Sequence, residues 1–255
     1  MTNHIVTVTD CVDIAANELR GTLISTVGDA DVSVEPFVPI LPAFSAINGN
    51  LAMRLMADCY PDGTVLLSTL GPLKERPKAI IGRTLKKDLV FIGRNTGIFD
   101  WLTRDLGCAE LYDVSAHYGE GKKFVSFAGR SVTAPLAAQA ALGVPLSDLG
   151  TPLDESEIVR LDLADGTIAH IDNFGSMKFT GGLPSTEEGA RYRVTVKGRS
   201  VEAVYAHRMI GLDTGTWSLF PGSSLGMFEL GCVRHYGLPE LGAEVGDVLE
   251  IELLG

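Results

Sequence analysis

In the first half of the chain, short apolar runs alternate with stretches whose apolar residues recur at helical spacing. Apolar, β-branched residues predict strands at 5–9, 32–34, 65–67, 79–81 and 89–92, and helical spacing predicts helices at 15–27, 42–56 and 135–142. Gly28 and Gly143 stand where a helix typically ends. The alternation of strand and helix predicts a mainly parallel sheet covered by helices.

After about residue 150 the pattern changes to strands alone. Alternating apolar and polar residues predict strands at 158–163, 167–171, 192–196, 201–205 and 248–253. Asp165-Gly166 is typical of a two-residue hairpin turn between the first two of these strands. We therefore expect an α/β domain at residues 1–150 and an all-β domain, a small antiparallel barrel or sandwich, at 156–255. The Pro- and Gly-containing stretch 143–155 is the expected linker.

Charge and composition exclude several classes of partner. The 255 residues carry a net charge of −11, and no basic run exceeds two lysines, so neither nucleic acid nor an anionic membrane surface is an expected partner. No apolar run approaches the ~20 residues that span a bilayer. The four cysteines form no C-x-x-C pair, and together with the absence of a leader-like N-terminus this indicates free thiols in a cytoplasmic protein.

Several polar positions are candidates for chemistry. Asp10 follows the first strand, where a carboxylate can accept ribose hydroxyls or, equally, cap the next helix. The segment 172–176 interrupts a strand, as either a bulge that aims side chains or an ordinary turn. The loop 71–77 follows a buried strand and is either part of a site or a solvated turn. The five histidines lack close ligand spacing, so no metal site is expected.

Five segments, in this order, resemble motifs of the S-adenosylmethionine hydrolases, also called SAM hydroxide adenosyltransferases, which are related to the SAM-dependent fluorinase and chlorinase. The segments are Thr9-Asp10 with Asp13 and Arg20-Gly21, similar to T-D-F-G…D…M-K-G; Phe91-Ile92-Gly93-Arg94-Asn95-Thr96-Gly97, similar to F-V-G-P-D-N-G; Phe127-Ala128-Gly129-Arg130-Ser131 with Ala134-Pro135, similar to F-H-G-R-D…A-P; Ile171-Asp172-Asn173-Phe174-Gly175-Ser176, similar to I-D-R-F-G-N; and Ser223-Ser224 with Gly226-Met227-Phe228-Glu229-Leu230, similar to S-S-G-Y-L-E-I.

The resemblance implies a homotrimer whose ligand, S-adenosylmethionine or another adenosine derivative, lies between the N-terminal domain of one subunit and the C-terminal domain of its neighbour. It implies no further cofactor. The site residues that it implies are Asp10 on the ribose hydroxyls, Phe127 and Gly129 near the 5′ carbon, Asp172 and Ser224 on the methionine amino and carboxylate groups, Phe174 and Ser176 beside the adenine, and Tyr205 as a stacking candidate for that ring.

This chain departs from the family pattern at the groups that would activate water. The family's Asp, Arg and His fall on Leu70, Pro77 and Ala128, and Arg76, next to Pro77, is the candidate catalytic residue that remains. Two functions stay open. The chain is either an enzyme that displaces methionine from the 5′ carbon, with water or another nucleophile, or a binding protein that holds an adenosine derivative without chemistry.

Overall fold

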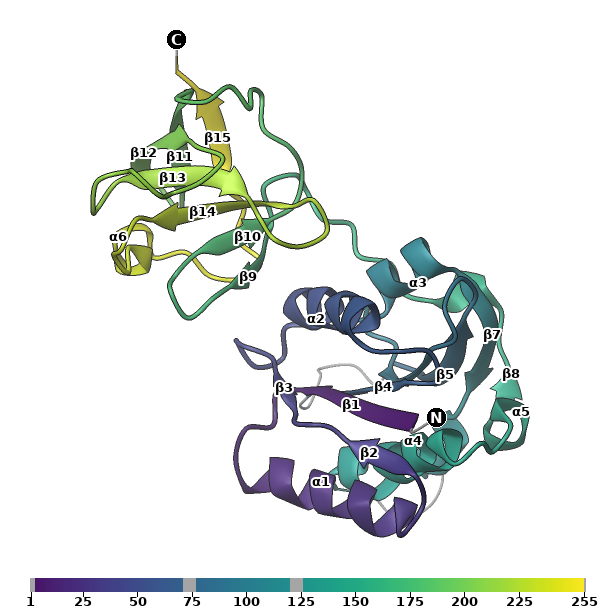
Figure 1. Ribbon diagram of the computed structural model, residues 1–255. Coiled ribbons are helices and arrows are strands. Elements are labelled where there is room, and N and C mark those ends of the chain that lie inside the picture. Colours follow the sequence, from purple (N-terminus) through teal and green to yellow (C-terminus); the bar gives the residue numbers. More distant parts are fainter. Residues whose placement is uncertain (1–2, 71–76, 120–125, 255) are drawn as a thin grey trace. The chain divides into compact units, whose positions relative to one another are not determined.

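The computed structural model describes residues 3–70, 77–119 and 126–254 (Figure 1). The chain divides into two compact units, the N-terminal unit Met1–Leu161 and the C-terminal unit Asp162–Gly255. None of the described helices combines the length and the apolarity that a membrane span requires.

The N-terminal unit contains one sheet, with the strand order β2-β1-β4-β6-β5-β7-β8 and β3 beside β1. The pairs of β1 with β2, β3 and β4, and of β4 with β6, are parallel, whereas β5, β7 and β8 continue the sheet in antiparallel pairs. The predicted mainly parallel sheet is thus confirmed. The strands are β1 (Asn3–Thr9), β2 (Val32–Val34), β3 (Val38–Pro39), β4 (Val65–Thr69), β5 (Ala79–Thr84), β6 (Val90–Arg94), β7 (Cys108–Asp113) and β8 (Thr151–Pro152).

Helices cover both faces of this sheet (Figure 1). One apolar core lies between the sheet and α1, α4 and α5, and a second lies between the sheet and α2 and α3. The apolar side chains alternate between the two cores along each strand, which explains why β4 is buried along its whole length. The helices are α1 (Ile14–Val27), α2 (Ala46–Cys59), α3 (Asp100–Leu106), α4 (Ala134–Ala141) and α5 (Leu146–Leu149), with short turns η1 (Ser115–Tyr118), η2 (Gly129–Thr133) and η3 (Glu155–Glu157).

Helix α2 begins later than its apolar pattern predicts. A start at Pro42 is wrong, because Phe44 adopts φ 67°, a left-handed conformation that no α-helix contains. Ser45 is the N-cap instead, and its hydroxyl accepts a hydrogen bond from the backbone N–H of Asn48 at 3.1 Å.

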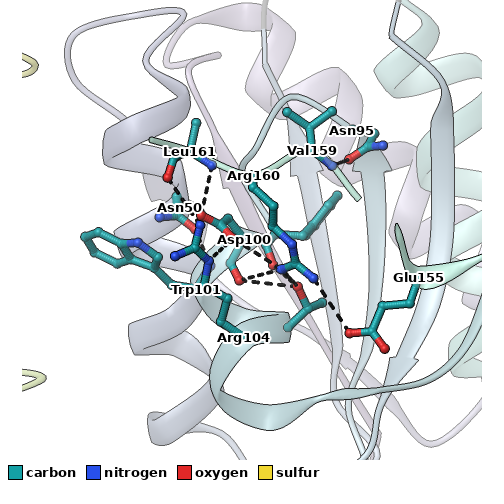
Figure 2. A network of polar contacts seen from close by, with 11 residues as sticks. Asn50, Asn95, Asp100, Trp101, Arg104, Glu155, Val159, Arg160 and Leu161 are labelled. Atoms are coloured by element: carbon teal, nitrogen blue, oxygen red, sulfur yellow. Dashed lines mark hydrogen bonds and ion pairs between the residues drawn. The ribbon is translucent and has the colours of Figure 1, made fainter. Parts of the chain in front are cut away.

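The strand predicted at 158–163, and its hairpin with 167–171, are also wrong. This segment is irregular, and side chains of the N-terminal unit take the place of a partner strand (Figure 2). The amide oxygen of Asn95 accepts from the backbone N–H of Val159, and the carboxylate of Asp100 accepts from that of Leu161, both at 2.9 Å. The N-terminal unit consequently extends to Leu161, and the expected linker 143–155 contributes α5 and β8 to it.

The C-terminal unit is a curled sheet of order β15-β11-β12-β13-β14-β10-β9, in which every pair but β12–β13 is antiparallel. Residues 246–249, just before β15, bond to residues 166–168 beside β9, so that the two ends of the sheet meet around an apolar core. The expected all-β domain is confirmed. Its elements are β9 (Ile168–Ile171), β10 (Met177–Phe179), β11 (Arg191–Val196), β12 (Arg199–Tyr205), β13 (Trp217–Pro221), β14 (Phe228–Cys232), α6 (Leu238–Leu241) and β15 (Glu250–Leu253).

Candidate functional site

The carboxyl ends of β1 and β4 meet the start of η2. The hydroxyl of Thr69, at the end of β4, donates to the hydroxyl of Thr9, at the end of β1, at 2.7 Å. Gly129 begins η2 so close to Thr69 that a Cβ at this glycine would lie 3.0 Å from the Thr69 methyl carbon. Because ligands of parallel sheets bind outside the carboxyl ends of the strands, this edge is the first place to look for a site.

Asp10 lies at this edge and lines a cavity of about 280 Å³, together with Cys11, Val12 and Phe44 among others. Its carboxylate accepts a hydrogen bond from the backbone N–H of Phe44 at 2.9 Å. Asp13, and not Asp10, caps α1, since the Asp13 carboxylate accepts from the N–H of Ala15 at 2.9 Å. The capping alternative for Asp10 is therefore excluded, and its carboxylate borders the cavity instead.

Cys11 is the nucleophilic side chain nearest to Asp10 in the sequence. Burial raises the pKa of its thiol above the ordinary value, and the neighbouring Asp10 carboxylate acts in the same direction. A hydrogen bond to Thr9 opposes this rise. At neutral pH the sulfur therefore stays protonated, and a protonated thiol is a poor nucleophile.

Phe127 and Gly129 stand at the turn that leads into η2. Phe127 adopts φ 55°, and its carbonyl accepts from the backbone N–H groups of Arg130 and Ser131 at 3.1 and 3.2 Å. Its ring packs against the core beneath α1 and α4. The five-residue π-helical turn that follows is a form that recurs at functional sites. Through Thr69, the fold thus brings Phe127 and Gly129 to the sheet edge at which Asp10 lies.

In the C-terminal unit, the segment 172–176 is an ordinary turn, which decides between the two alternatives left open by the sequence. The Asp172 carboxylate accepts from the backbone N–H groups of Phe174 and Ser176 at 2.8 and 2.9 Å. The irregularity in this hairpin lies further on, between Lys178 and Phe179. The turn leaves Phe174 72% exposed, so its side chain is available for contact with a ligand or another chain.

Ser224 and Tyr205 do not join the turn at Asp172. Met177 pairs with Leu230 and Phe179 with Phe228, so the turn 172–176 lies where β14 ends, whereas Ser224 lies in the turn where β14 begins. The Tyr205 ring is only 2% exposed and belongs to the core of the C-terminal unit. A ring packed in this way has no face free for a purine, so we leave Tyr205 out of the site.

The positions where the family carries activating groups hold apolar side chains. Leu70 packs against the core beneath α2 and α3, and Ala128 precedes Gly129 at η2. Arg76, the candidate catalytic residue, lies outside the described residues. Within the described part of the chain, no group of three His, Cys, Asp or Glu side chains is placed to hold a metal ion.

Arg94 and the two threonines at the strand ends, Thr9 and Thr69, are not among the site residues expected from the sequence. Arg94 ends β6 two residues after the apolar run 90–92, and Thr69 ends β4 two residues after the apolar run 65–67. A polar or charged residue at the end of a buried parallel strand was therefore the available signal, because such residues face the ligand edge of the sheet.

Comparison with known proteins adds a family to this geometry. A family model described as the SAM hydroxide adenosyltransferase N-terminal domain matches residues 5–150. The (R)-S-adenosyl-L-methionine hydrolase of Salinispora tropica is 40% identical over 62 residues, which cover 21% of this chain and 24% of that relative. The match thus spans about a quarter of the curated relative.

Two solved structures are similar over nearly the whole chain. An uncharacterized conserved protein from Thermotoga maritima superimposes with a TM-score of 0.80 at 22% identity, covering 97% of this chain and 99% of that one. A conserved hypothetical protein from Thermus thermophilus gives 0.75 at 22% identity, covering 99% and 100%. At this level of identity the two structures support the fold of both units.

Proposed function

The chain belongs to the SAM hydroxide adenosyltransferase family, and on that premise we propose that it binds S-adenosylmethionine and catalyses nucleophilic displacement at the 5′ carbon. The products with water would be adenosine and methionine. The observation that carries the proposal is the cavity at Asp10, which lies at the carboxyl end of β1 inside the segment that the family model matches. A carboxylate at this place is suited to accept the two ribose hydroxyls.

The proposed ligand contacts extend from this cavity. Asp10 would hold the ribose, while Gly129, which lies close to Thr69 at the same edge, and Phe127, two residues before it, would border the 5′ carbon. Asp172, Phe174 and Ser176 would come from a second subunit of a homotrimer, whereas Ser224 lies at the other end of β14 from their turn. Exposed apolar side chains around the cavity favour such an assembly, since Val12, Ile14 and Phe44 are 65%, 79% and 55% exposed.

The reaction needs little acid–base machinery. The oxygen of water forms a bond to the 5′ carbon as the bond from that carbon to sulfur breaks, and the bonding electron pair leaves on sulfur. Methionine departs as a neutral thioether, so no general acid has to protonate it. The proton released by water passes to solvent. The task of the protein is to hold the nucleophile in line behind the 5′ carbon and to exclude competing solvent.

The second candidate function is a binding protein of the same fold without catalysis. The observation that favours it is the set of side chains at Leu70, Pro77 and Ala128, none of which can accept a proton or donate a side-chain hydrogen bond. Arg76 remains a candidate for orienting the nucleophile under the first function. Both functions use the same pocket, so they differ only in turnover.

One incubation separates the two functions. Purified full-length protein is mixed with S-adenosylmethionine in buffers with and without halide salts, and adenosine, halogenated adenosine and methionine are followed by chromatography. Enzyme-dependent product with 1:1 release of methionine supports catalysis. Saturable binding of S-adenosylmethionine by calorimetry with no product in any buffer would assign the chain to the binding class, and absence of both binding and product would reject the pocket itself.

A further inference from the structure

A charged side chain stands at the end of β6 in line with the two threonines. Strands β4 and β6 are parallel with Leu67 opposite Ile92, and continuing this register by two residues places Arg94 beside Thr69. Thr69 in turn lies opposite Thr9 on β1. Since Leu67 and Ile92 point into the same core, side-chain alternation puts Thr69 and Arg94 on that face of the sheet.

Two contacts hold the guanidinium of Arg94 in place. One terminal nitrogen donates to the carbonyl oxygen of Pro77 at 2.9 Å, and the central carbon lies 3.9 Å from the centre of the Tyr118 ring. When a guanidinium stacks on an aromatic face, its N–H groups lie in the plane of the guanidinium and point outward. A ligand beside the stack can accept hydrogen bonds from them.

A hydrogen bond between Tyr118 and the last residue of η2 holds the tyrosine in place. Its hydroxyl lies 2.7 Å from the hydroxyl of Thr133, which also reaches the carbonyl of Ala128 at 3.4 Å. Burial raises the pKa of the Tyr118 phenol, with Arg94 and Thr133 opposing the rise, so the phenol stays neutral at physiological pH. The contacts of Arg94 therefore lead from β6 to the residue that precedes Gly129.

No carboxylate in the described ranges 3–70, 77–119 and 126–254 forms an ion pair with Arg94. By contrast, Arg83 on the neighbouring strand β5 pairs with both Asp88 and Glu110. A guanidinium carries five N–H donors, and the contact with Pro77 uses one of them. As far as the described residues show, Arg94 thus combines a fixed plane, spare donors and a positive charge at the ligand edge of the sheet.

We propose that Arg94, held against Tyr118, binds the attacking nucleophile and aims it at the 5′ carbon. This inference rests on the proposed function, and it identifies Arg94 as a residue that brings a positive charge to the nucleophile. A water oxygen that accepts one hydrogen bond from Arg94 keeps a second lone pair for the new bond to carbon. The positive charge also stabilises the hydroxide character that develops as the proton leaves for solvent.

The test compares variants of the full-length chain. Arg94→Ala is expected to lower kcat for S-adenosylmethionine about 100-fold, the loss typical of one missing transition-state donor, while KM and calorimetric adenosine affinity stay near wild type. Added guanidinium ion should restore part of the Arg94→Ala turnover, which it would not do for a purely structural defect. Tyr118→Leu, which removes the ring but leaves the arginine, should give an intermediate loss of kcat.

Arg83→Ala is the matched control, because it removes a paired sheet arginine away from the proposed site. Equal kcat losses in Arg83→Ala and Arg94→Ala, or wild-type kcat in Arg94→Ala, would overturn the inference while leaving the proposed function intact. If Arg76→Ala lost turnover while Arg94→Ala kept wild-type turnover, the inference would also be overturned and the proposed function would stand. A wild-type chain that binds adenosine without turning over S-adenosylmethionine would reject catalysis and this inference together, before any variant is made.

Discussion

The carboxylate of Asp100 accepts a hydrogen bond from the backbone N–H of Leu161, 61 residues further along the chain, at 2.9 Å. Asp100 is fully buried, and it also accepts from the guanidinium groups of Arg104 at 2.6 Å and Arg160 at 3.2 Å (Figure 2). These donors replace the water that burial removes from the carboxylate. One acidic side chain therefore fixes the last residues of the N-terminal unit.

Asp100→Ala should destabilise the N-terminal unit strongly. It leaves the Leu161 N–H without its acceptor and removes the anion beside two arginines, so we expect the free energy of unfolding to fall by about 3–5 kcal/mol. Urea unfolding followed by circular dichroism measures the change. The control is Glu157→Ala, which breaks an exposed pair with Lys78 and should cost about 0.2–1 kcal/mol. Equal losses in the two variants would contradict the role assigned to Asp100.

Asp10→Ala should weaken nucleoside binding. The ribose hydroxyls would lose their acceptor, and we expect the binding free energy of adenosine to weaken by about 1–3 kcal/mol. Isothermal titration calorimetry measures this affinity directly. Asp58→Ala is the matched control, since it removes an exposed carboxylate that pairs with Arg54 on α2. An unaltered affinity in Asp10→Ala would take Asp10 out of the site.

The C-terminal unit contains an ion pair between Lys178 and Glu229 that is largely shielded from solvent, with side chains 8% and 14% exposed. Removing one partner leaves an uncompensated charge in a poorly solvated place. Lys178→Met should therefore lower the free energy of unfolding by about 3–5 kcal/mol. The double variant Lys178→Met/Glu229→Leu should lose less than the single one, as measured by thermal and urea unfolding. Additive losses in this double-mutant cycle would argue against the pair.

His170 should make the C-terminal unit sensitive to acid. Burial lowers the pKa of its imidazole, the carboxylates of Asp172 and Glu229 oppose this shift, and Lys178 adds to it. The folded state therefore binds the proton less readily than the unfolded state. The stability that depends on neutral His170 is complete above about pH 6.5 and is lost as the pH falls through the lowered pKa of the folded state.

His170→Gln tests this dependence, because it has no imidazole to protonate. As the pH is lowered from 7.5 to about 5, the unfolding free energy of wild type should fall by more than that of His170→Gln. Carboxylates that titrate in the same range are common to both proteins and cancel in the difference. A difference that is constant with pH would show that His170 is not the titrating group.

The sequence predicted the elements whose signal is local. Strand β4, with its consecutive apolar residues, and strands β11 and β12, with their alternating ones, were found where the pattern placed them, because burial on one or both faces of a strand leaves a mark within a few residues. Asp10 was identified in the same way, from its position directly after a strand. The alternative that Asp10 caps the next helix stayed open until Asp13 proved to be the cap, and the role of Asp10 on the ribose stays a prediction.

Tertiary structure decided what depends on residues far apart in the chain. The pattern at 158–163 is that of a strand, yet Asn95 and Asp100 take up its backbone N–H groups, and no local pattern shows such distant acceptors. The approach of Thr9, Thr69 and Gly129 at one edge, with Arg94 in line, likewise follows from how parallel strands are ordered in the sheet. An alternating pattern of apolar and polar residues is a property of neighbours in sequence, whereas the hydrogen-bond partners of a segment are neighbours in space, and they decide whether it becomes a strand.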